Sequence, residues 1–526
     1  MKNEQENTPE ESVDPSKIIA TLQHEVHRKD HEIEYLKERV DLLTHQLYGK
    51  KSEKLLASSG AEQMSLFSLG EEDDSADTPP VETFSVAAHQ KKKPGRKPLP
   101  STLPRKEVIH DISDEDKICG CGSILTQFGA EASEKLNYIP ATLEVIRHIR
   151  PKYACRSCEG TEGKGATIKI APPHPQILPK SLAAPGLLAH VVTAKFADSI
   201  PLYRQEKQFI RLGLDLPRAT MAGWLIRLSE ACEKVTNQLK SDILAGPLIN
   251  IDETTIQVLD EAERSPSTKS YMWVLRGGPP ENPSVLFHYD KSRAARVAEK
   301  LLDGYRGVVQ CDGYSGYGFL DSLPEVFHAG CWAHARRKFM EVSKALGKAA
   351  KGKKATDAHK ALAFIGKIYA IEKEAKALGL SAEEISTKRR SETKPLLEEF
   401  HRWLLLKLDQ TPPKGLLGKA VFYTLAQWPR LIVFLDHGFM TPDNNLAENA
   451  IRPFVVGRKN WLFCKTPKGA KATAVLYSLV ESAKACGLEP YKYLTHLFKH
   501  LPEAATEAQI KKLLPQNLLG APAFLA

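Results

Sequence analysis

Apolar residues in the segment 18–47 recur at alternating steps of three and four positions. This spacing predicts a helix with a coiled-coil seam, because an apolar residue every 3.5 positions stays on one side of a supercoiled helix. An amphipathic helix packed against its own chain would show the same pattern. We favour self-association over residues 15–57, since the segment precedes any obvious domain, and therefore expect a homo-oligomer. The seam positions are Ile19, Leu22, Val26, Lys29, Ile33, Leu36, Val40, Leu43 and Leu47, of which Lys29 alone is polar.

Residues 58–106 show neither a helical nor a strand period and are predicted to be a linker. An acidic cluster, EEDDSAD, is followed by the basic stretch KKKPGRKPLPSTLPRK at 91–106, whose prolines exclude a helix. The Gly-Arg-Lys-Pro sequence around Arg96 and Lys97 is similar to short arms that lie in A·T-rich minor grooves. A solvated basic linker would look much the same. We predict that Arg96 and Lys97 contact DNA.

Two close pairs of cysteines mark the next unit, residues 107–175. Pairs about 33 residues apart, joined by strand-like alternation, predict two turns that grip one tetrahedral Zn²⁺. The second pair has the usual C-x-x-C spacing, whereas the first is a tighter C-x-C. Four thiolates leave no open position, so the expected zinc site is structural; unrelated buried thiols are the alternative. The predicted ligands are Cys119, Cys121, Cys155 and Cys158.

Residues 176–245 have helical periodicity. The stretch PRATMAGWLIRLSEAC at 217–232 fits the second helix of a helix-turn-helix pair, with Thr220 near its start. A helical hairpin that serves only for packing fits equally well. We predict a helical DNA-binding region here.

From residue 247 the pattern changes to that of strands. Three apolar runs, an amphipathic helix and a fourth run, GVVQCDGYSGY, follow in the order β-β-β-α-β, with VFHAGCWAH as a fifth strand. This order predicts a ribonuclease-H-like α/β core, in which the first and fourth strands are parallel neighbours. Residues 343–435 are rich in Ala, Lys, Leu and Glu with a helical period, and predict a helical insertion. The core is therefore expected over 246–342 and 436–480, with a helical segment over 481–526.

Three carboxylates are the candidate catalytic residues. Asp252 lies within the first strand and Asp312 at the tip of the fourth, so parallel pairing would bring them together. TPDNNLAENAIRPF predicts a helix on which Asn444, Glu448 and Arg452 share one face. The alternatives are strand-end or turn-opening roles for the aspartates and a surface ion pair of Glu448 with Arg452.

Cations and an aromatic residue follow Glu448, and cations beside an aromatic suit contact with phosphates and bases. A C-x-x-H pair, Cys331 and His334, precedes two further arginines. We expect this pair to brace the active site or contact DNA rather than bind metal, with plain packing as the alternative. The predicted DNA contacts of this region are Arg336, Arg337, Arg452, Arg458, Lys459 and Trp461, and the predicted supporting residues are Cys331, His334 and Asn444.

The bulk properties of the chain limit the class of protein. Its 526 residues are too many for one core, and 42% hydrophobic residues exclude disorder throughout. No run of about 18 apolar residues predicts a membrane span, and the polar N-terminus has no apolar signal core. The scattered cysteines outside the two pairs fit a reducing compartment. We therefore expect a multidomain cytoplasmic protein with no membrane partner.

The chain resembles the transposases of the insertion sequence 66 family, a DDE-type bacterial family. The resemblance runs through nearly the whole chain and rests on long strings: YGKKSEKL, PGRKPLPSTLPR with the cysteine unit, IDET, CDGYSGY, GCWAHARRKF, NNLAENAIRPFVVGRKNWLF and LYSLVESAKACGLEPYKYL. Asn449 departs from the family, whose members usually carry Arg after the Glu. That difference bears on a DNA contact and not on the three acids.

The resemblance implies a reaction and its cofactors. Asp252, Asp312 and Glu448 would hold two Mg²⁺ ions about 4 Å apart, with Mn²⁺ as a substitute. The enzyme would cleave double-stranded DNA at the terminal inverted repeats and join the ends to target DNA in the bacterial cytoplasm, at the nucleoid. Small companion proteins of the same element are further expected partners. A non-catalytic DNA-binding protein and a nuclease or Holliday-junction enzyme on the same fold are the rival functions.

Overall fold

The computed structural model describes residues 143–154, 168–345 and 356–519, together with six residues of the N-terminal segment. These six are helical and exposed, and four of them, Val26, Ile33, Leu36 and Val40, are apolar seam positions. The rest of the predicted coiled coil lies outside the described residues. So do Arg96 and Lys97 of the basic arm and the four predicted zinc ligands, Cys119, Cys121, Cys155 and Cys158.

The chain divides into two compact units. One comprises Met1–Gly49 and His148–Phe524, and the other Lys50–Arg147 with Leu525–Ala526. The described residues of the second unit, 143–147, are exposed and form no helix or strand. All the helices and strands that the structure describes belong to the first unit.

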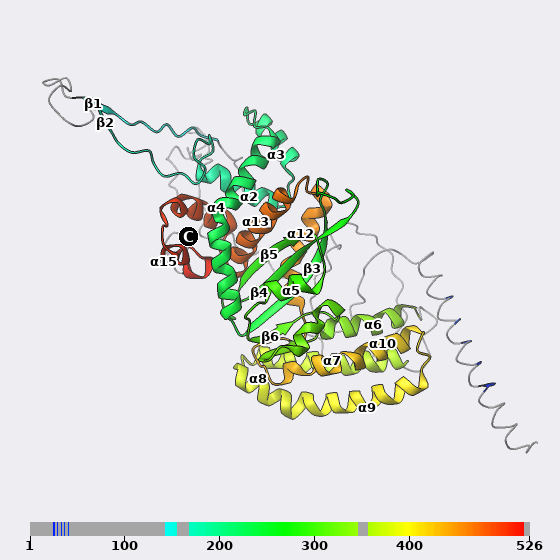
Figure 1. The fold of residues 1–526 in the computed structure, drawn as a ribbon. Helices are drawn as coiled ribbons and strands as arrows, with labels where there is room; N and C mark the ends of the chain where they lie inside the picture. The colour runs from blue at the N-terminus through cyan, green and yellow to red at the C-terminus, as the bar shows by residue number, and fades with distance from the viewer. Residues whose placement is uncertain are drawn as a thin grey trace, which may run out of the picture. The chain divides into compact units, whose positions relative to one another are not determined.

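A five-stranded mixed sheet forms the centre of the first unit (Figure 1), in the order β5-β4-β3-β6-β7. Strands β3, β4 and β5 are antiparallel neighbours, whereas β6 pairs in parallel with both β3 and β7. In chain order β3 is the first strand of this sheet and β6 the fourth, and they are parallel neighbours, as predicted from the sequence. The strands are β3 (Leu248–Gln257), β4 (Lys269–Gly277), β5 (Ser284–Asp290), β6 (Gly307–Gln310) and β7 (Val326–Ala329).

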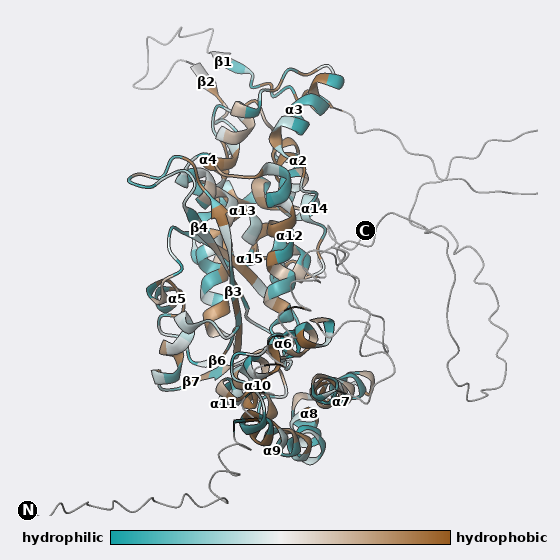
Figure 2. Ribbon diagram, turned by 90° about the vertical axis from the view of Figure 1, so that its right-hand side faces the viewer, coloured by the Kyte–Doolittle hydropathy of each residue, from teal (hydrophilic) through white to brown (hydrophobic). Residues whose placement is uncertain are grey.

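Helices cover both faces of this sheet, and Figure 2 shows α12 and α13 on one side of β3 and α5 on the other. On the α5 side, Ile249 and Ile251 of β3 pack in one apolar cluster with Trp273. On the other side, Val274 of β4 packs in a second cluster with Phe454 of α12. Because side chains alternate along a strand, Asn250, which lies between Ile249 and Ile251, faces α12. The covering elements are α4 (Arg218–Ala245), α5 (Ala295–Leu301), the 3₁₀ helix η1 (Ser315–Ser322), α12 (Asn445–Trp461) and α13 (Pro467–Ala485).

The segment before the sheet and the C-terminal segment pack together. A two-stranded antiparallel hairpin precedes two helices, and the C-terminal helix α14 packs on α2. No helix among the described residues has the length and apolar composition to cross a bilayer. The elements are β1 (Lys152–Ala154), β2 (Ile168–Ile170), α2 (Pro185–Phe196), α3 (Leu202–Arg211), α14 (Pro490–His500), η5 (Leu501–Glu503), α15 (Glu507–Lys512) and η6 (Pro515–Asn517).

Between β7 and α12 the described residues form helices, which Figure 1 shows layered beyond the β6 end of the sheet. They have an apolar core of their own, in which Trp332, Phe339 and Phe400 are fully buried. Asp357–Ala377 and Lys394–Gln410 are its two longest helices. The elements are α6 (Trp332–Ala345), α7 (Asp357–Ala377), α8 (Ala382–Lys388), the π-helical turn η3 (Arg389–Thr393), α9 (Lys394–Gln410), α10 (Leu416–Ala426), α11 (Trp428–Leu431) and η4 (Val433–Leu435).

Lys195 of α2 is a partly buried cation whose ammonium lies 5.2 Å from the centre of the Trp461 ring. Burial lowers the pKa of Lys195 to about 8. The unfolded chain, with a lysine pKa of about 10.4, then binds more protons than the folded chain between about pH 8 and pH 10, so this cost to stability is present in full at pH 7 and fades as the pH rises through that window. We expect Lys195→Met to raise the free energy of unfolding by about 1–3 kcal/mol at pH 7 and by much less at pH 10.

Urea unfolding at the two pH values measures this difference. Lys207→Met, on an exposed position of α3, is the control and should show no such pH-dependent gain. An equal effect of Lys195→Met at both pH values would contradict the prediction.

Candidate active site

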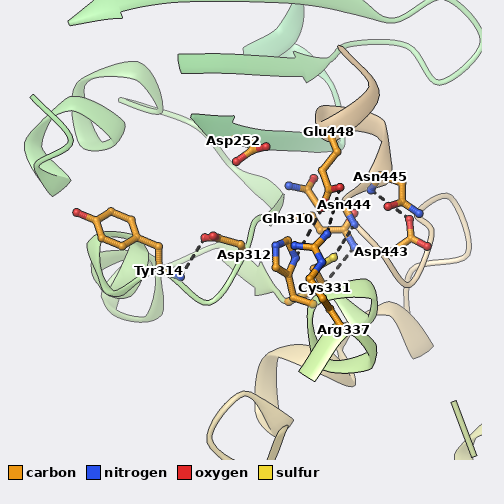
Figure 3. A network of polar contacts seen from close by, with 12 residues as sticks. Asp252, Gln310, Asp312, Tyr314, Cys331, Arg337, Asp443, Asn444, Asn445 and Glu448 are labelled. Carbon is orange, nitrogen blue, oxygen red and sulfur yellow. Dashed lines mark hydrogen bonds and ion pairs between the residues drawn. The ribbon is translucent and has the colours of Figure 1, made fainter. Parts of the chain in front are cut away.

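The pairing of β3 with β6 brings Asp252 and Asp312 close together. Asn250 pairs with Gln310, the last residue of β6; Asp252 lies two residues further along β3, and Asp312 lies two residues beyond the end of β6. Because side chains alternate with a period of two along a strand, Asp252 shares the α12 face with Asn250. Figure 3 shows Asp252 and Asp312 around one space with Glu448.

Local hydrogen bonds fix the two aspartates. The Asp252 carboxylate accepts the backbone N–H of Glu253 at 2.8 Å, and the Asp312 carboxylate accepts that of Tyr314 at 3.0 Å. Burial, and then the negative charges of Glu253, Asp312 and Glu448, together raise the pKa of Asp252 to about 8. The site thus gathers carboxylates whose charge the protein alone does not balance, which suits a divalent cation with oxygen ligands.

Glu448 lies in the first turn of α12, where the helix dipole favours a carboxylate. One carboxylate oxygen is 3.8 Å from Nδ1 of His334, and the other is 3.7 Å from the Arg337 guanidinium. Cys331, His334 and Glu448 offer ligand atoms that lie within 4.8 Å of one another. Burial, and then the charge of Arg337, lower the pKa of His334. The imidazole is therefore a neutral neighbour of Glu448 at pH 7.

A buried network of side-chain amides ties α12 to the two strands. Nδ2 of Asn250 donates to Gln310 at 2.8 Å and to Asn444 at 3.1 Å. The side chain of Asn444 in turn donates to the Ile251 carbonyl at 2.9 Å, and the backbone carbonyl of Asn444 accepts the N–H of Glu448 at 3.2 Å. All three amide residues are buried. This network fixes the start of α12, and hence Glu448, beside Asp252.

Asn250 and Gln310 are the site residues that the sequence reasoning missed. Each stands two positions before an aspartate, as a polar residue inside an otherwise apolar strand. A buried amide in a strand needs a partner, because an unsatisfied polar group costs about 1–3 kcal/mol. In both strands an amide residue is followed by an apolar residue or a cysteine, and then by an aspartate. This repeated pattern was the available signal.

We expect Asn250→Ala to lower the free energy of unfolding by about 1–3 kcal/mol, because it leaves acceptor oxygens of Gln310 and Asn444 buried and unpaired. Chemical unfolding measures the effect. Asn237→Ala, on an exposed position of α4, is the matched control. Wild-type stability of the Asn250 variant would show that the network does not hold the helix.

Glu253 adjoins Asp252 but is engaged on the other face of the sheet. Nε of Arg293 donates to Glu253 at 2.6 Å, and the Tyr317 hydroxyl donates to its second oxygen. Arg293 also stacks on the Tyr314 ring, 3.7 Å from its centre. Glu253 is therefore already paired, which makes it a weaker candidate for a metal ligand than Asp252.

A second polar cluster lies behind Asp312. The Cys311 thiol is 3.1 Å from Nε2 of His328, whose Nδ1 is 2.7 Å from Asp321. This order of groups is that of a nucleophile triad. However, the thiol is fully buried, and burial raises its pKa well above the usual value, so no substrate reaches it in this state. Asp321 is 46% exposed and also pairs with Arg430 at 2.5 Å. We interpret the cluster as a support for the end of β6.

The predicted DNA contacts differ in their surroundings. On α6, Arg337 is 55% exposed and Arg336 is partly buried. On α12, Arg452 is partly buried and Lys459 is exposed.

Two other residues predicted to contact DNA, Arg458 and Trp461, make contacts within the protein itself. Arg458 donates to the hydroxyls of Thr254 and Thr255 at 3.2 and 3.1 Å. The Trp461 ring packs edge-on against Phe454, with 5.5 Å between the ring centres. Both residues therefore have intramolecular partners at the α12 side of β3.

Four family models match the chain. The model described as the transposase IS66 family matches residues 180–472, which contain all three acids. The zinc-finger binding domain of transposase IS66 matches 116–159, a range that includes the four paired cysteines. The transposase C of IS166 homeodomain matches 35–108, and the IS66 C-terminal element matches 478–516.

Relatives of similar length occur in Sinorhizobium fredii. The uncharacterized protein y4jD is 34% identical over 432 residues, which are 80% of this chain and 81% of the relative. The uncharacterized protein y4hP is 28% identical over 496 residues, 91% of this chain and 87% of the relative. The family match over residues 180–472 and the similarity over most of each relative lead to one conclusion: this chain belongs to the IS66 family of transposases.

Proposed function

We propose that the chain binds the terminal inverted repeats of its element and catalyses metal-dependent DNA cleavage and strand transfer. Asp252, Asp312 and Glu448 are the proposed ligands of two Mg²⁺ ions. The observation that carries this proposal is the β3–β6 pairing, which brings the two aspartates near each other, together with the amide network that ties Glu448 to them. The strand order β5-β4-β3-β6-β7 supports a ribonuclease-H-like core.

The donor set fits the proposed ions. Carboxylate oxygens are the ligands that Mg²⁺ prefers, and Mn²⁺ accepts the same set. When bound, the ions would supply Lewis-acid activation of the attacking oxygen and stabilise the leaving oxygen. The role of this chain's own residues is to hold three carboxylates around one space and to keep their spacing through Asn250, Gln310 and Asn444.

The proposed chemistry has two in-line displacements. In the first, water attacks a phosphodiester at the element's end, and the 3′-oxygen leaves with a proton as a free hydroxyl. In the second, that 3′-hydroxyl attacks a target phosphodiester, forms the new bond and releases the target's own 3′-oxygen. No bond between protein and DNA forms at either step.

The proposal also includes a DNA contact, a structural zinc site and self-association. The exposed side chain of Arg337 supports a phosphate contact beside Glu448. The family match over 116–159 supports a structural Zn²⁺ held by the paired cysteines. The exposed apolar positions Val26, Ile33, Leu36 and Val40 support self-association through the N-terminal helix.

One experiment separates the proposal from its rivals. Purified protein is incubated with Mg²⁺, DNA that carries the element's terminal repeats and a target plasmid, with the element's companion proteins added. Cleaved ends with free 3′-hydroxyls and joined products are expected. Hydrolysis without joining would favour a nuclease on this fold, and binding without cleavage would favour a non-catalytic DNA-binding protein. Either result would overturn the proposal.

A further inference from the structure

Cys331, His334 and Glu448 form a compact set of mixed donors. A thiol sulfur, an imidazole nitrogen and a carboxylate oxygen lie within 4.8 Å of one another. Cys331 and His334 come from the start of α6, and Glu448 comes from the first turn of α12. Two chain segments more than a hundred positions apart thus present three different ligand types to one point.

Two of these donor atoms are buried without a hydrogen-bond partner. They are Nδ1 of His334 and Oε1 of Glu448, and they lie 3.8 Å apart. That separation is too long for a hydrogen bond, so each atom bears the cost of lost hydration. A cation between them would satisfy both at once.

The surroundings of the sulfur also suit a metal ligand. The backbone N–H of Asn444 donates to Sγ of Cys331 at 3.2 Å. Asn444 is held by the amide network, so this donor is fixed in place. The sulfur therefore has a fixed position beside the other two donor atoms.

We propose that Cys331, His334 and Glu448 form a site for a borderline divalent ion such as Zn²⁺, distinct in ligand chemistry from the Asp252–Asp312 pair. Sulfur and imidazole donors select Zn²⁺ over Mg²⁺, which prefers oxygen. Zinc bonds of about 2.0–2.3 Å place the ligands of one ion roughly 3.3–3.8 Å apart, so the set must contract slightly on binding. Three protein ligands leave a fourth position open.

Arg337 is the competitor at this site. Its guanidinium is 3.7 Å from the second oxygen of Glu448, and its side chain is 55% exposed. An exposed ion pair of this kind is weak, so the guanidinium can move into solvent when an ion binds. Because Glu448 also belongs to the proposed catalytic set, an ion held here would compete with its role there.

Metal content of the full-length protein tests the inference. After dialysis against Zn²⁺, the wild-type protein should retain one equivalent more than His334→Ala or Cys331→Ser, whatever zinc the paired cysteines hold in all three. With Co²⁺ in place of Zn²⁺, the sulfur-to-cobalt absorption should be weaker in Cys331→Ser than in wild type. Cys464→Ser, a cysteine outside the set, is the matched control and should leave both readouts unchanged.

A second variant probes the site without removing a ligand. Arg337→Ala should tighten binding of the additional ion severalfold, because it removes the competing cation. Equal zinc content and equal cobalt spectra in wild type and His334→Ala would overturn the inference, as would a wild-type protein with no additional equivalent. These readouts do not depend on DNA cleavage. An inactive protein that binds the additional ion would therefore defeat the proposed function and leave this inference standing.

Discussion

Asp252→Asn is expected to lower DNA cleavage and strand transfer by at least about a thousandfold, which corresponds to about 4 kcal/mol in the activation barrier. The amide keeps the size of the side chain but removes the charge that a divalent ion needs. Burial, and then the negative charges of Glu253, Asp312 and Glu448, raise the pKa of Asp252. DNA affinity should stay at the wild-type level, because the backbone and the surface cations are unchanged.

Gel assays of cleavage and joining, together with a binding titration on the same repeat DNA, measure the two properties. Asp303→Asn is the control, because Asp303 is exposed beyond α5. The folded state should tolerate Asp252→Asn, since burial among carboxylates already disfavours a charge there. Cleavage at the wild-type rate by Asp252→Asn would exclude Asp252 from catalysis, whereas a loss of binding would point to a wider structural defect.

The positions of Asp252 and Asp312 were predictable because their signals are local. Apolar runs of strand length end or turn at each aspartate, and the order of the runs predicts which strands are neighbours. The parallel pairing of β3 with β6 agrees with that prediction. Local signals suffice here because a strand's period determines the face on which each side chain lies.

The amide network could not be predicted in the same way. Its hydrogen bonds join Asn250 to residues 60 and 194 positions away. No spacing rule relates such positions, because their contact depends on how the helical insertion returns the chain to the sheet. The sequence offered only the anomaly of Asn250 and Gln310, two polar residues in apolar strands.

Composition alone also does not tell which side of a helix faces the protein. Arg458 and Trp461 follow Glu448 in a segment whose cations and aromatic suggested DNA contact. In the fold, Arg458 donates to two threonine hydroxyls of β3 and Trp461 packs on Phe454. Their role in DNA binding stays a prediction, whereas their packing role follows from these contacts.

Arg389 links the helical insertion to the segment that leads to Glu448. It is 2% exposed and pairs through two nitrogens with Glu372 of α7, at 2.8 and 2.7 Å. Its remaining donors reach the carbonyls of Phe434, His437 and Met440 at 2.6–2.9 Å. These carbonyls belong to the stretch just before α12. One buried guanidinium therefore connects two insertion helices to the approach of the third acid.

A second contact acts on the same stretch. The Tyr369 side chain of α7 lies beside Asp443, whose carboxylate accepts the N–H of Asn445 at 3.1 Å. The first residue of α12 is thus fixed from the insertion as well as from the sheet. The insertion, on this reasoning, helps to position Glu448 rather than merely interrupting the core.

Arg389→Leu is therefore expected to lower the free energy of unfolding by about 3–5 kcal/mol, because it removes a buried guanidinium and leaves Glu372, 17% exposed, without its cation. Three carbonyls lose a donor at the same time. At temperatures where the variant is still folded, cleavage should fall more than DNA binding, since Glu448 loses part of its support. Urea unfolding and cleavage assays at low temperature measure the two effects.

Arg390→Leu is the matched control within the same π-helical turn. Arg390 is 64% exposed and its ion pair with Asp436, at 3.3 Å, lies at the surface, so its loss should cost less than about 1 kcal/mol. Arg389→Lys should fall between the two, because it keeps the charge but not the paired geometry. If Arg389→Leu and Arg390→Leu were equally stable and equally active, the insertion would have no part in holding the third acid.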